Sequence, residues 1–183
     1  MWLAENFHHC PKCGSPKLNS KKGKSFECPD CGFHFYLNPA AAAAGLIFCE
    51  RRPGQVLLIR RAKEPKKGTL ALVGGFVDQG ETLEETLARE VREELGAELD
   101  GLIYHASFSN EYVFHDVKYP VTDTFFRAYV HQENFQVDKA EVGEVVWCDV
   151  RTLDLQELAF TSMQQAIAKY RDALENRPEA GSR

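Results

Sequence analysis

The stretch Gly75-Phe76-Val77-Asp78-Gln79-Gly80-Glu81 leads into a run that ends Arg89-Glu90-Val91-Arg92-Glu93-Glu94-Leu95-Gly96-Ala97, and this segment decides the fold of the chain. Glycines bracket its first part, which predicts a loop. After Thr82 the sequence predicts an amphipathic helix, because apolar residues recur at every fourth position. These residues are Leu83, Leu87, Val91 and Leu95. Gly96 is expected to end the helix, since glycine readily adopts the left-handed conformation found just past a helix.

Carboxylates gather on one edge of this expected helix. Glu90, Glu93 and Glu94 are spaced i, i+3 and i+4, so they share an edge beside the apolar stripe. Like charges at these spacings repel each other, and their grouping therefore indicates a compensating cation. Oxygen ligands in this number suit Mg²⁺ or Mn²⁺. The competing interpretation is a solvated acidic face paired with Arg89 and Arg92, and the charges alone do not decide between the two.

The spacing of the whole motif does decide between them. A glycine, five residues, a glutamate, seven residues and then Arg-Glu-aliphatic-x-Glu-Glu-x-Gly resembles the Nudix box. The matching positions are Gly75, Glu81, Arg89, Glu90, Val91, Glu93, Glu94 and Gly96. So many matches at fixed offsets make the resemblance specific.

The resemblance implies an α/β fold, the Nudix α/β/α sandwich with a mixed β-sheet. It implies that the enzyme hydrolyses a diphosphate linkage with a catalytic Mg²⁺ or Mn²⁺. The implied metal ligands are Glu90, Glu93, Glu94 and the carbonyl of Gly74. Arg89 would orient the carboxylates, and Glu81 would have a structural role.

Cysteine spacing predicts a small zinc ribbon ahead of this domain. Two Cys-x-x-Cys pairs, each followed by glycine, are separated by 14 residues and suit a tetrahedral four-thiolate zinc site better than disulfides. An iron site or a redox pair remains as an alternative. The expected ligands of a structural Zn²⁺ are Cys10, Cys13, Cys28 and Cys31. Because four thiolates fill the coordination shell, the neighbouring His8 and His9 are expected to face solvent.

Composition sets broad limits on the class of protein. The chain has 183 residues, of which 44% are hydrophobic and 27% are charged, which is typical of globular proteins with a sizeable core. A net charge of −5 gives no reason to expect bulk attraction to nucleic acid or to anionic membranes. No apolar run approaches the length of a membrane span, and Met1 to Phe7 is too short for a signal peptide. We therefore expect a cytoplasmic protein that does not contact membranes.

The sequence divides into three predicted parts, a zinc ribbon at residues 1–37, a Nudix hydrolase domain at 38–175 and a disordered tail at 176–183. Asn38-Pro39 marks the hinge, because proline fits neither a helix interior nor a central strand. Strands are expected at residues 40–49, 55–60, 102–110, 118–132 and 142–150, a loop or hairpin at 111–116, and a closing helix at 161–175. The alanine run at residues 40–44 also suits a helix, but the aliphatic residues after Gly45 favour a strand.

Lysines and aromatic residues are interleaved in the ribbon. This pattern is typical of nucleic-acid-binding ribbons, but it also fits lysines that solvate a hairpin tip and aromatics that pack on the metal knuckles. We favour the second interpretation because few lysines are involved, and nucleic acid is not expected as a partner. The residues concerned are Lys17, Lys21, Lys22, Lys24, Phe26, Phe33, Phe35 and Tyr36.

Five residues outside the box are further candidates for the site. Arg60 and Arg61 end a predicted strand and begin a basic stretch, so either binds a substrate phosphate or lies in an exposed loop. Phe114 could stack on a nucleobase, although aromatics at strand ends are more often part of a core. Similarity to Nudix enzymes implies an extra carboxylate before the last strand, as a metal ligand or general base, and the candidates by position are Glu141 and Glu144.

The resemblance covers roughly residues 10–150 and is to Nudix hydrolases with an N-terminal zinc ribbon, a group that includes NADH, FAD and ADP-ribose pyrophosphatases. NADH pyrophosphatases carry Ser-Gln-Pro-Trp-Pro-Phe-Pro shortly after the box, where this chain has Ala106-Ser107-Phe108-Ser109-Asn110. We therefore expect a small-molecule nucleotide substrate, with ADP-ribose or FAD ahead of NADH. The alternatives are a nucleoside triphosphate pyrophosphatase and a non-catalytic Nudix protein that senses nucleotides or binds nucleic acid. The family likeness also allows a homodimer.

Overall fold

The computed structural model describes residues 1–176, so most of the predicted disordered tail lies outside the described residues. The chain forms two compact units. The first unit comprises Met1–Ala40 and Glu111–Val121, and the second comprises Ala41–Asn110 and the chain from Thr122 onward. The predicted boundary after residue 37 stays a prediction, and the sequence did not indicate that residues 111–121 would group with the ribbon.

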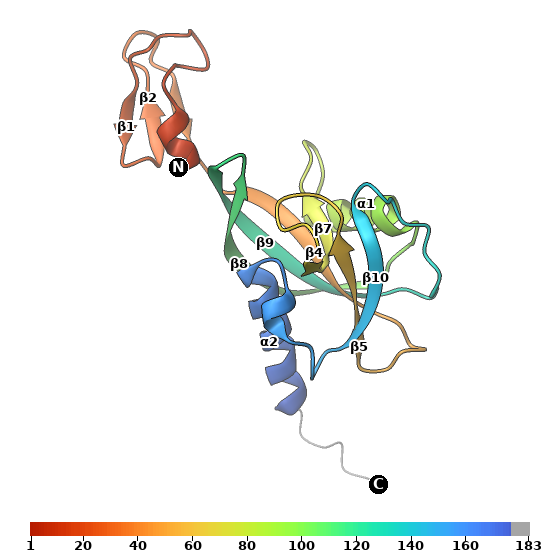
Figure 1. The fold of residues 1–183 in the computed structure, drawn as a ribbon. Helices are drawn as coiled ribbons and strands as arrows, with labels where there is room; N and C mark the ends of the chain where they lie inside the picture. Colours follow the sequence, from red (N-terminus) through yellow and green to blue (C-terminus); the bar gives the residue numbers. More distant parts are fainter. Residues whose placement is uncertain (177–183) are drawn as a thin grey trace. The chain divides into compact units, whose positions relative to one another are not determined.

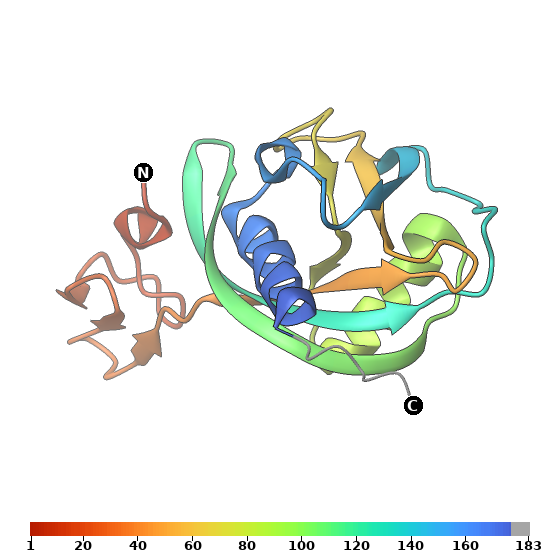
Figure 2. The same ribbon diagram turned by 90° about the horizontal axis from the view of Figure 1, so that it is seen from below.

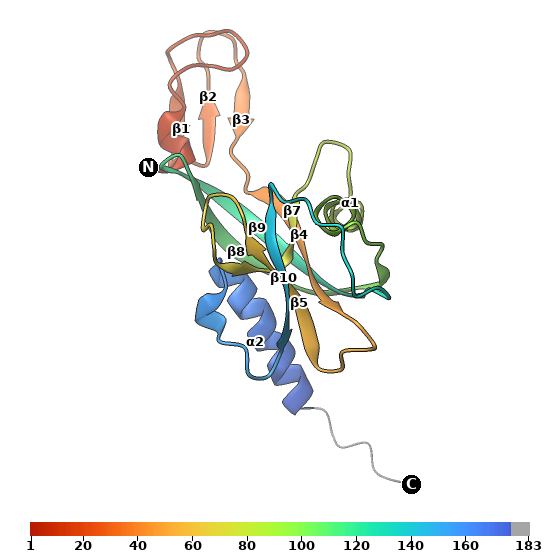
Figure 3. The ribbon, with the colours of Figure 1, turned by 45° about the vertical axis from the view of Figure 1, so that its right-hand side comes forward.

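The first unit is a three-stranded antiparallel sheet with a short helix and a hairpin. Figure 3 shows its strands in the order β1-β2-β3. The elements are η1 (Leu3–Asn6), β1 (Asn19–Lys21), β2 (Ser25–Glu27) and β3 (His34–Tyr36). Phe7 stacks on two neighbouring aromatic rings of the sheet, with centroid distances of 5.1 Å to Phe26 and 5.3 Å to Phe35. These rings supply the small apolar core that the ribbon can build, and a metal is expected to supply the rest.

The hairpin of the first unit joins the ends of two long strands. Its turn consists of His115 and Asp116, whose φ angles of 46° and 63° fit a two-residue turn matched to the strand twist. Glu111 and Lys118 form an ion pair of 3.2 Å across it. The predicted strand at 102–110 therefore extends further than expected, because its alternating pattern continues up to this turn.

The second unit is a mixed β-sheet between helices (Figures 1 and 2), so the predicted α/β/α fold class is confirmed. Its strand order is β10-β5-β4-β9-β8, with β6 paired to β5 and β7 paired to β4. The strands are β4 (Ala40–Phe48), β5 (Gln55–Arg61), β6 (Leu70–Ala71), β7 (Val73–Phe76), β8 (Asp100–Phe114), β9 (Val117–Tyr129) and β10 (Val142–Asp149). The helices are α1 (Leu83–Leu95), η2 (Leu155–Glu157) and α2 (Thr161–Glu175).

The alanine run forms a strand, as its aliphatic neighbours predicted. Ala43 of β4 pairs with Gly75 of β7, and Ala44 pairs with Gly74. Small residues on both strands bring the two backbones close together without side chains in the way. This close pairing places the glycine pair directly beside α1, whose Leu87 is fully buried in the core.

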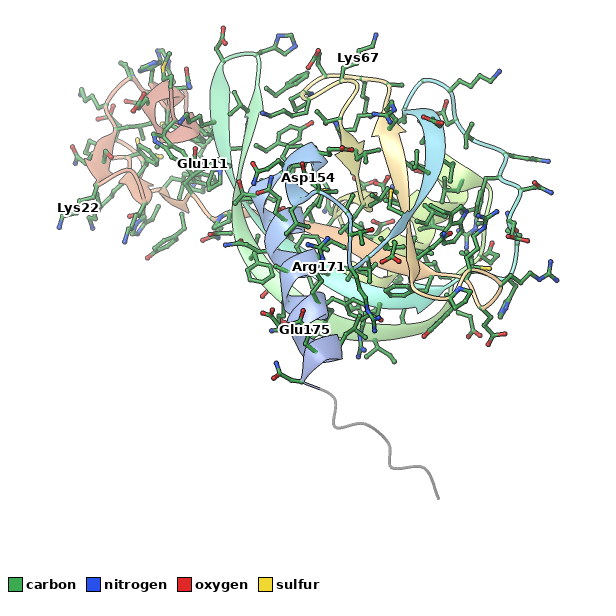
Figure 4. All side chains as sticks on the ribbon, turned by 60° about the horizontal axis from the view of Figure 1, so that its bottom comes forward. Lys22, Lys67, Glu111, Asp154, Arg171 and Glu175 are labelled. Carbon is green, nitrogen blue, oxygen red and sulfur yellow. The ribbon has the colours of Figure 1, made fainter. Side chains whose placement is uncertain are left out.

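Helix α2 closes the second unit at the predicted residues. Its Ala166 and Ile167 are fully buried, and the guanidinium of Arg171 donates hydrogen bonds to the carbonyl oxygens of Val150 and Leu153 (Figure 4). These bonds fix the loop after β10 onto the helix. None of the helices within residues 1–176 has the length and apolar content needed to cross a membrane.

Candidate active site

The start and end of α1 are fixed by local hydrogen bonds. Thr82 Oγ1 accepts a hydrogen bond of 3.2 Å from the backbone N–H of Glu85, and the Glu85 carboxylate accepts one of 2.8 Å from the N–H of Thr82. This reciprocal capping box satisfies backbone donors that the first helical turn leaves unpaired. At the other end, Gly96 has a φ of 61° and stops the helix, as predicted. The carboxylates between these caps therefore have a fixed position on the helix.

Arg89 organises the acidic edge of α1. Its Nε and Nη2 donate to the two carboxylate oxygens of Glu81 at 2.7 and 3.0 Å, which is a bidentate pair. Its Nη1 donates to Glu90 at 2.9 Å and to Glu93 at 3.1 Å. A further bond of 3.2 Å from Nη2 reaches the carbonyl oxygen of Phe76 in the loop before the helix. One guanidinium thus joins the loop to the edge of the helix that carries Glu90 and Glu93.

Glu81 remains ionised in this arrangement. The bidentate bonds from Arg89 lower the pKa of Glu81 to about 2, and hydrogen bonds from Thr86 and the backbone of Asp78 act in the same direction. Thr86 Oγ1 donates to Glu81 at 2.9 Å and is fully buried. Glu81 is therefore committed to holding Arg89, which agrees with the structural role that the resemblance implies.

Glu94 and Glu90 lie in a very different environment. Burial, and then the negative charges of Glu90 and Glu141, raise the pKa of Glu94 to about 8. Burial also raises the pKa of Glu90, against the opposing effect of Arg89. Glu94 is 6% exposed, and its Oε2 has no hydrogen-bond partner within residues 1–176. A buried carboxylate oxygen without a partner is costly, so its retention points to a ligand of positive charge.

The chemistry of these residues suits a divalent cation, but within the described residues their carboxylate oxygens do not form a group within 4.8 Å of one another, as the four cysteines do. The unpartnered oxygen of Glu94 is one observation, and a second is that the Glu90 carboxylate, in its present position, occupies the space where a Cβ on residue 75 would lie. The donor set is made of carboxylate and carbonyl oxygens, which Mg²⁺ and Mn²⁺ prefer. Glu90, Glu93 and Glu94, with the Gly74 carbonyl, are the residues that would hold the ion, and this assignment stays a prediction.

The structure brings Glu141 and two basic side chains to the same carboxylates. The negative charge of Glu141 raises the pKa of both Glu90 and Glu94, while the positive charges of Lys63 and Arg61 oppose the rise for Glu94. Lys63 Nζ donates a short hydrogen bond to Glu141, and the Glu141 carbonyl accepts one of 2.8 Å from the N–H of Ala62. The loop after β5 therefore holds the loop before β10 beside α1.

The other sequence candidates make contacts outside the acidic edge of α1. Arg60 bonds to Glu144 at 3.3 Å and to the carbonyl oxygen of Gly68 at 2.9 Å. Arg61 instead donates to the Pro65 carbonyl at 2.8 Å and lies 5.5 Å from the ring centroid of Phe160. Phe114 belongs to the first compact unit, where it ends β8, and its contact with substrate stays a prediction.

The four knuckle cysteines form a second potential metal site. Within residues 1–176 they are the cluster whose ligand atoms all lie within 4.8 Å of one another. The Sγ atoms are 3.7 Å apart in the pairs Cys10–Cys31 and Cys13–Cys28. Four sulfurs at about 2.3 Å from one tetrahedral Zn²⁺ would be about 3.8 Å apart, whereas a disulfide requires about 2.0 Å. The cluster therefore fits zinc and not disulfides.

The two knuckles have the same local structure. Gly14 N–H donates to the Cys10 carbonyl at 2.8 Å, and Gly32 N–H donates to the Cys28 carbonyl at 2.9 Å. Both glycines have positive φ, at 74° and 68°, which is the left-handed conformation that the tight turn requires. His8 is exposed outside the cluster, as expected. Repetition of one turn on two sides of the cluster is typical of a zinc ribbon.

We expect the purified chain to contain about one zinc per molecule, which elemental analysis measures directly. Cys28→Ser should remove the metal and expose the ribbon to proteolysis, because binding of the ion supplies most of the stability of so small a module. Cys148→Ser is the matched control, since Cys148 lies on β10 outside the cluster. Retention of full zinc content in Cys28→Ser would contradict the site.

We also expect the stability of the metal-free protein to fall as pH rises from 4.5 to about 8. In this window the folded chain keeps a proton on Glu94 that the unfolded chain has released, so rising pH favours unfolding. Mg²⁺ binds the ionised form of Glu94, which is more abundant at high pH. Mg²⁺ should therefore raise the melting temperature more at about pH 8 than at about pH 5. Thermal unfolding of wild type and Glu94→Gln at both pH values measures this, and equal Mg²⁺ effects in wild type would disprove it.

The fold and the acidic helix that Arg89 organises define a class of hydrolases with an α/β/α sandwich and a loop-helix-loop site. A family model described as the NUDIX domain matches residues 39–170, and the chain therefore belongs to the NUDIX family. Among solved structures, a NUDIX hydrolase from Nitrosomonas europaea is similar with a TM-score of 0.72 and 25% identity, covering 93% of this chain and 94% of that one.

Two curated relatives are similar in sequence. An ADP-ribose pyrophosphatase of Methanocaldococcus jannaschii is 47% identical over 64 residues, which is 35% of this chain and 36% of the relative. The NAD-capped RNA hydrolase NudC of Chromobacterium violaceum is 30% identical over 157 residues, which is 82% of this chain and 54% of the relative. The match thus spans between about a third and about half of the length of these relatives.

The sequence did not reveal Lys63 and Thr86 as parts of the site. Lys63 contacts a residue 78 positions away, which no local pattern indicates. The one sequence feature that points to Lys63 is its position two residues after Arg61. Residues two positions apart lie on the same side of an extended segment, so the two side chains are expected to share a side. Thr86 lies five residues after Glu81. This spacing brings the two side chains into contact only when the loop that carries Glu81 folds back onto the helix.

Proposed function

We propose that this chain is a divalent-metal-dependent pyrophosphatase that cleaves the diphosphate linkage of a nucleoside diphosphate derivative. The observation that carries the proposal is the buried, unpartnered carboxylate oxygen of Glu94 beside Glu90. A binding protein without turnover would have no need to bury such an acidic group. Membership of the NUDIX family, whose relatives include named pyrophosphatases, supports the same reaction class.

The roles of the residues follow from their surroundings. When bound, Mg²⁺ or Mn²⁺ supplies positive charge that opens the diphosphate to attack by water. Glu90, Glu93 and Glu94 hold the ion, and Arg89 keeps two of these carboxylates aligned. Glu141 would accept a proton from the attacking water, and its hydrogen bond from Lys63 would fix the position of the carboxylate.

ADP-ribose and FAD are the favoured substrates, ahead of NADH. The match to an ADP-ribose pyrophosphatase at 47% identity supports this order. The segment Ala106-Ser107-Phe108-Ser109-Asn110 supports it too, because it lacks the prolines of the NADH signature.

A substrate screen tests the proposal. Purified protein with Mg²⁺ or Mn²⁺ is incubated with ADP-ribose, FAD, NADH, NAD-capped RNA, dinucleoside polyphosphates and nucleoside triphosphates, and the products are identified by mass. Release of AMP from ADP-ribose or FAD with the highest kcat/KM is expected. A preference for nucleoside triphosphates would instead identify a nucleoside triphosphate pyrophosphatase. Absence of metal-dependent cleavage for every compound would reject a catalytic function.

Arg61 is the arginine that we assign to the substrate phosphate. Because Arg60 and Arg61 are adjacent on β5, their side chains leave opposite faces, and Arg61 is the one whose charge reaches Glu94. We expect Arg61→Ala to raise KM by about tenfold or more, as loss of a charge-assisted bond would, with little change in kcat. Arg60→Ala is the matched control with unchanged KM. Unchanged KM in both variants would remove both arginines from the site.

A further inference from the structure

A groove in the first compact unit has no role in the proposed hydrolysis. Its volume is about 940 Å³, which is at the large end of the range for sites that hold small molecules. Phe7 and Phe26, stacked at 5.1 Å, belong to its lining and are mostly covered. Two more rings of the lining stand open to solvent, since Tyr36 is 61% exposed and Trp2 is 39% exposed. His34 stacks on Tyr36 with a centroid distance of 4.5 Å, and Lys118 Nζ lies 5.5 Å from the centroid of the Trp2 ring. The aromatic surface that the groove offers is therefore the part of each ring that these contacts leave exposed.

Positive charge borders these rings. Lys22 and Lys24 are exposed residues of the groove, and neither forms an ion pair with any part of the described chain. The other lysines of the same hairpin are neutralised, Lys17 by Asp30 at 3.2 Å and Lys21 by Glu27 at 3.4 Å. The charge at the groove is thus local, in a chain whose net charge is −5. Figure 4 labels Lys22 at the edge of the first unit, where it points away from the sheet.

One lining residue carries negative charge, and it is occupied. The carboxylate of Glu5 accepts a hydrogen bond of 3.3 Å from the backbone N–H of Trp2 and thereby holds the short helix η1. An apolar groove of this kind suits a peptide or a second copy of the chain. Unpaired cations beside open aromatic rings instead suit a ligand that is both anionic and aromatic.

We propose that this groove binds single-stranded nucleic acid, with bases stacked on Tyr36 and Trp2 and phosphates contacted by Lys22 and Lys24. Stacking on aromatic rings accepts any base, and lysines follow the backbone, so the binding is expected to be independent of sequence. The sequence alone favours lysines that merely solvate a hairpin tip. The groove beside them is the observation that changes this interpretation. The proposal does not depend on the pyrophosphatase activity.

The fluorescence of Trp2 reports directly on binding in the groove, because Trp2 is one of its lining residues. The chain has two tryptophans, so Trp147→Phe leaves Trp2 as the single tryptophan. In this background, an oligouridylate of about ten nucleotides is titrated at low salt, a length within the usual site sizes for single strands. It carries no diphosphate linkage, and the active site cannot consume it. We expect saturable quenching of Trp2, weaker binding of a duplex of equal length, and a salt slope of about −1.4 for two phosphate contacts.

Matched variants separate the groove from general electrostatics. Lys22→Gln with Lys24→Gln should weaken binding by about tenfold and flatten the salt slope. Lys17→Gln with Lys21→Gln removes the same charge outside the groove and should leave affinity nearly unchanged. Tyr36→Ala should weaken binding without changing the slope. Equal losses in both lysine pairs, no quenching, or self-association that quenches Trp2 without oligonucleotide would overturn the proposal.

Discussion

Replacing Glu94 or Glu93 by glutamine should lower kcat by about 10³-fold or more while the protein stays folded. Glutamine has nearly the shape of glutamate, so packing around the buried Glu94 side chain is retained. It lacks the negative charge that a divalent cation requires, and it also removes the cost of burying that charge. The melting temperature of Glu94→Gln near neutral pH should therefore match or exceed that of wild type without added Mg²⁺.

Glu93 gives an independent test, because its side chain is 60% exposed and its replacement costs little packing. Glu84→Gln is the matched control, since Glu84 is an exposed residue in the first turn of the same helix. Steady-state kinetics with ADP-ribose, thermal unfolding and zinc content are compared for the three variants. Loss of fold in Glu93→Gln or Glu94→Gln would assign these residues a structural role, and an unchanged kcat would remove them from catalysis.

Local signals in the sequence were sufficient for most of the fold. Helix α1 follows from the four-residue apolar period that ends at Gly96, and α2 covers the predicted residues. Both are decided by residues within one or two turns of each other, which is the range over which periodicity carries information. The strand that contains the alanine run was harder to predict, because alanine by itself favours a helix. The aliphatic residues after Gly45, and the pairing with the glycines of β7, favour the strand.

Contacts between distant segments could not be predicted in the same way. The hairpin at His115 and Asp116 lacks the Asn-Gly or Asp-Gly pair that usually marks such a turn. The strands were therefore predicted to end at residue 110 and to begin at residue 118, whereas β8 ends at Phe114 and β9 begins at Val117. The bond between Lys63 and Glu141 depends on how β5 and β10 pair across the sheet. Likeness to Nudix enzymes gave Glu141 and Glu144 as candidates by their position before the last strand, but only the folded sheet shows which basic residue contacts Glu141.

The two neighbouring glycines of β7 are expected to respond to alanine in opposite ways. A Cβ on Gly75 would lie 2.2 Å from Glu90 Oε1 and 2.5 Å from its Cδ. Because this carboxylate ends a flexible side chain, it can turn away, and the fold should survive with a nearly unchanged melting temperature. The displacement falls on an expected metal ligand, and a misplacement of about 1 Å at a reacting centre costs about 10²-fold in rate. Gly75→Ala should therefore lose kcat without losing stability.

Gly74→Ala should instead destabilise the protein. Its Cβ would lie 2.1 Å from the carbonyl oxygen of Ala43 and 2.6 Å from the Cα of Ala44, which are backbone atoms of the paired strand and cannot turn away. The φ of 152° adds strain for any residue with a side chain. We expect a loss of about 3 kcal/mol or more, which lowers the melting temperature by about 6–12 °C. Kinetics and thermal unfolding of both variants distinguish the two effects. Similar losses of stability in both would mean that the Glu90 carboxylate is fixed as rigidly as the backbone, because only a mobile carboxylate lets Gly75→Ala keep its fold.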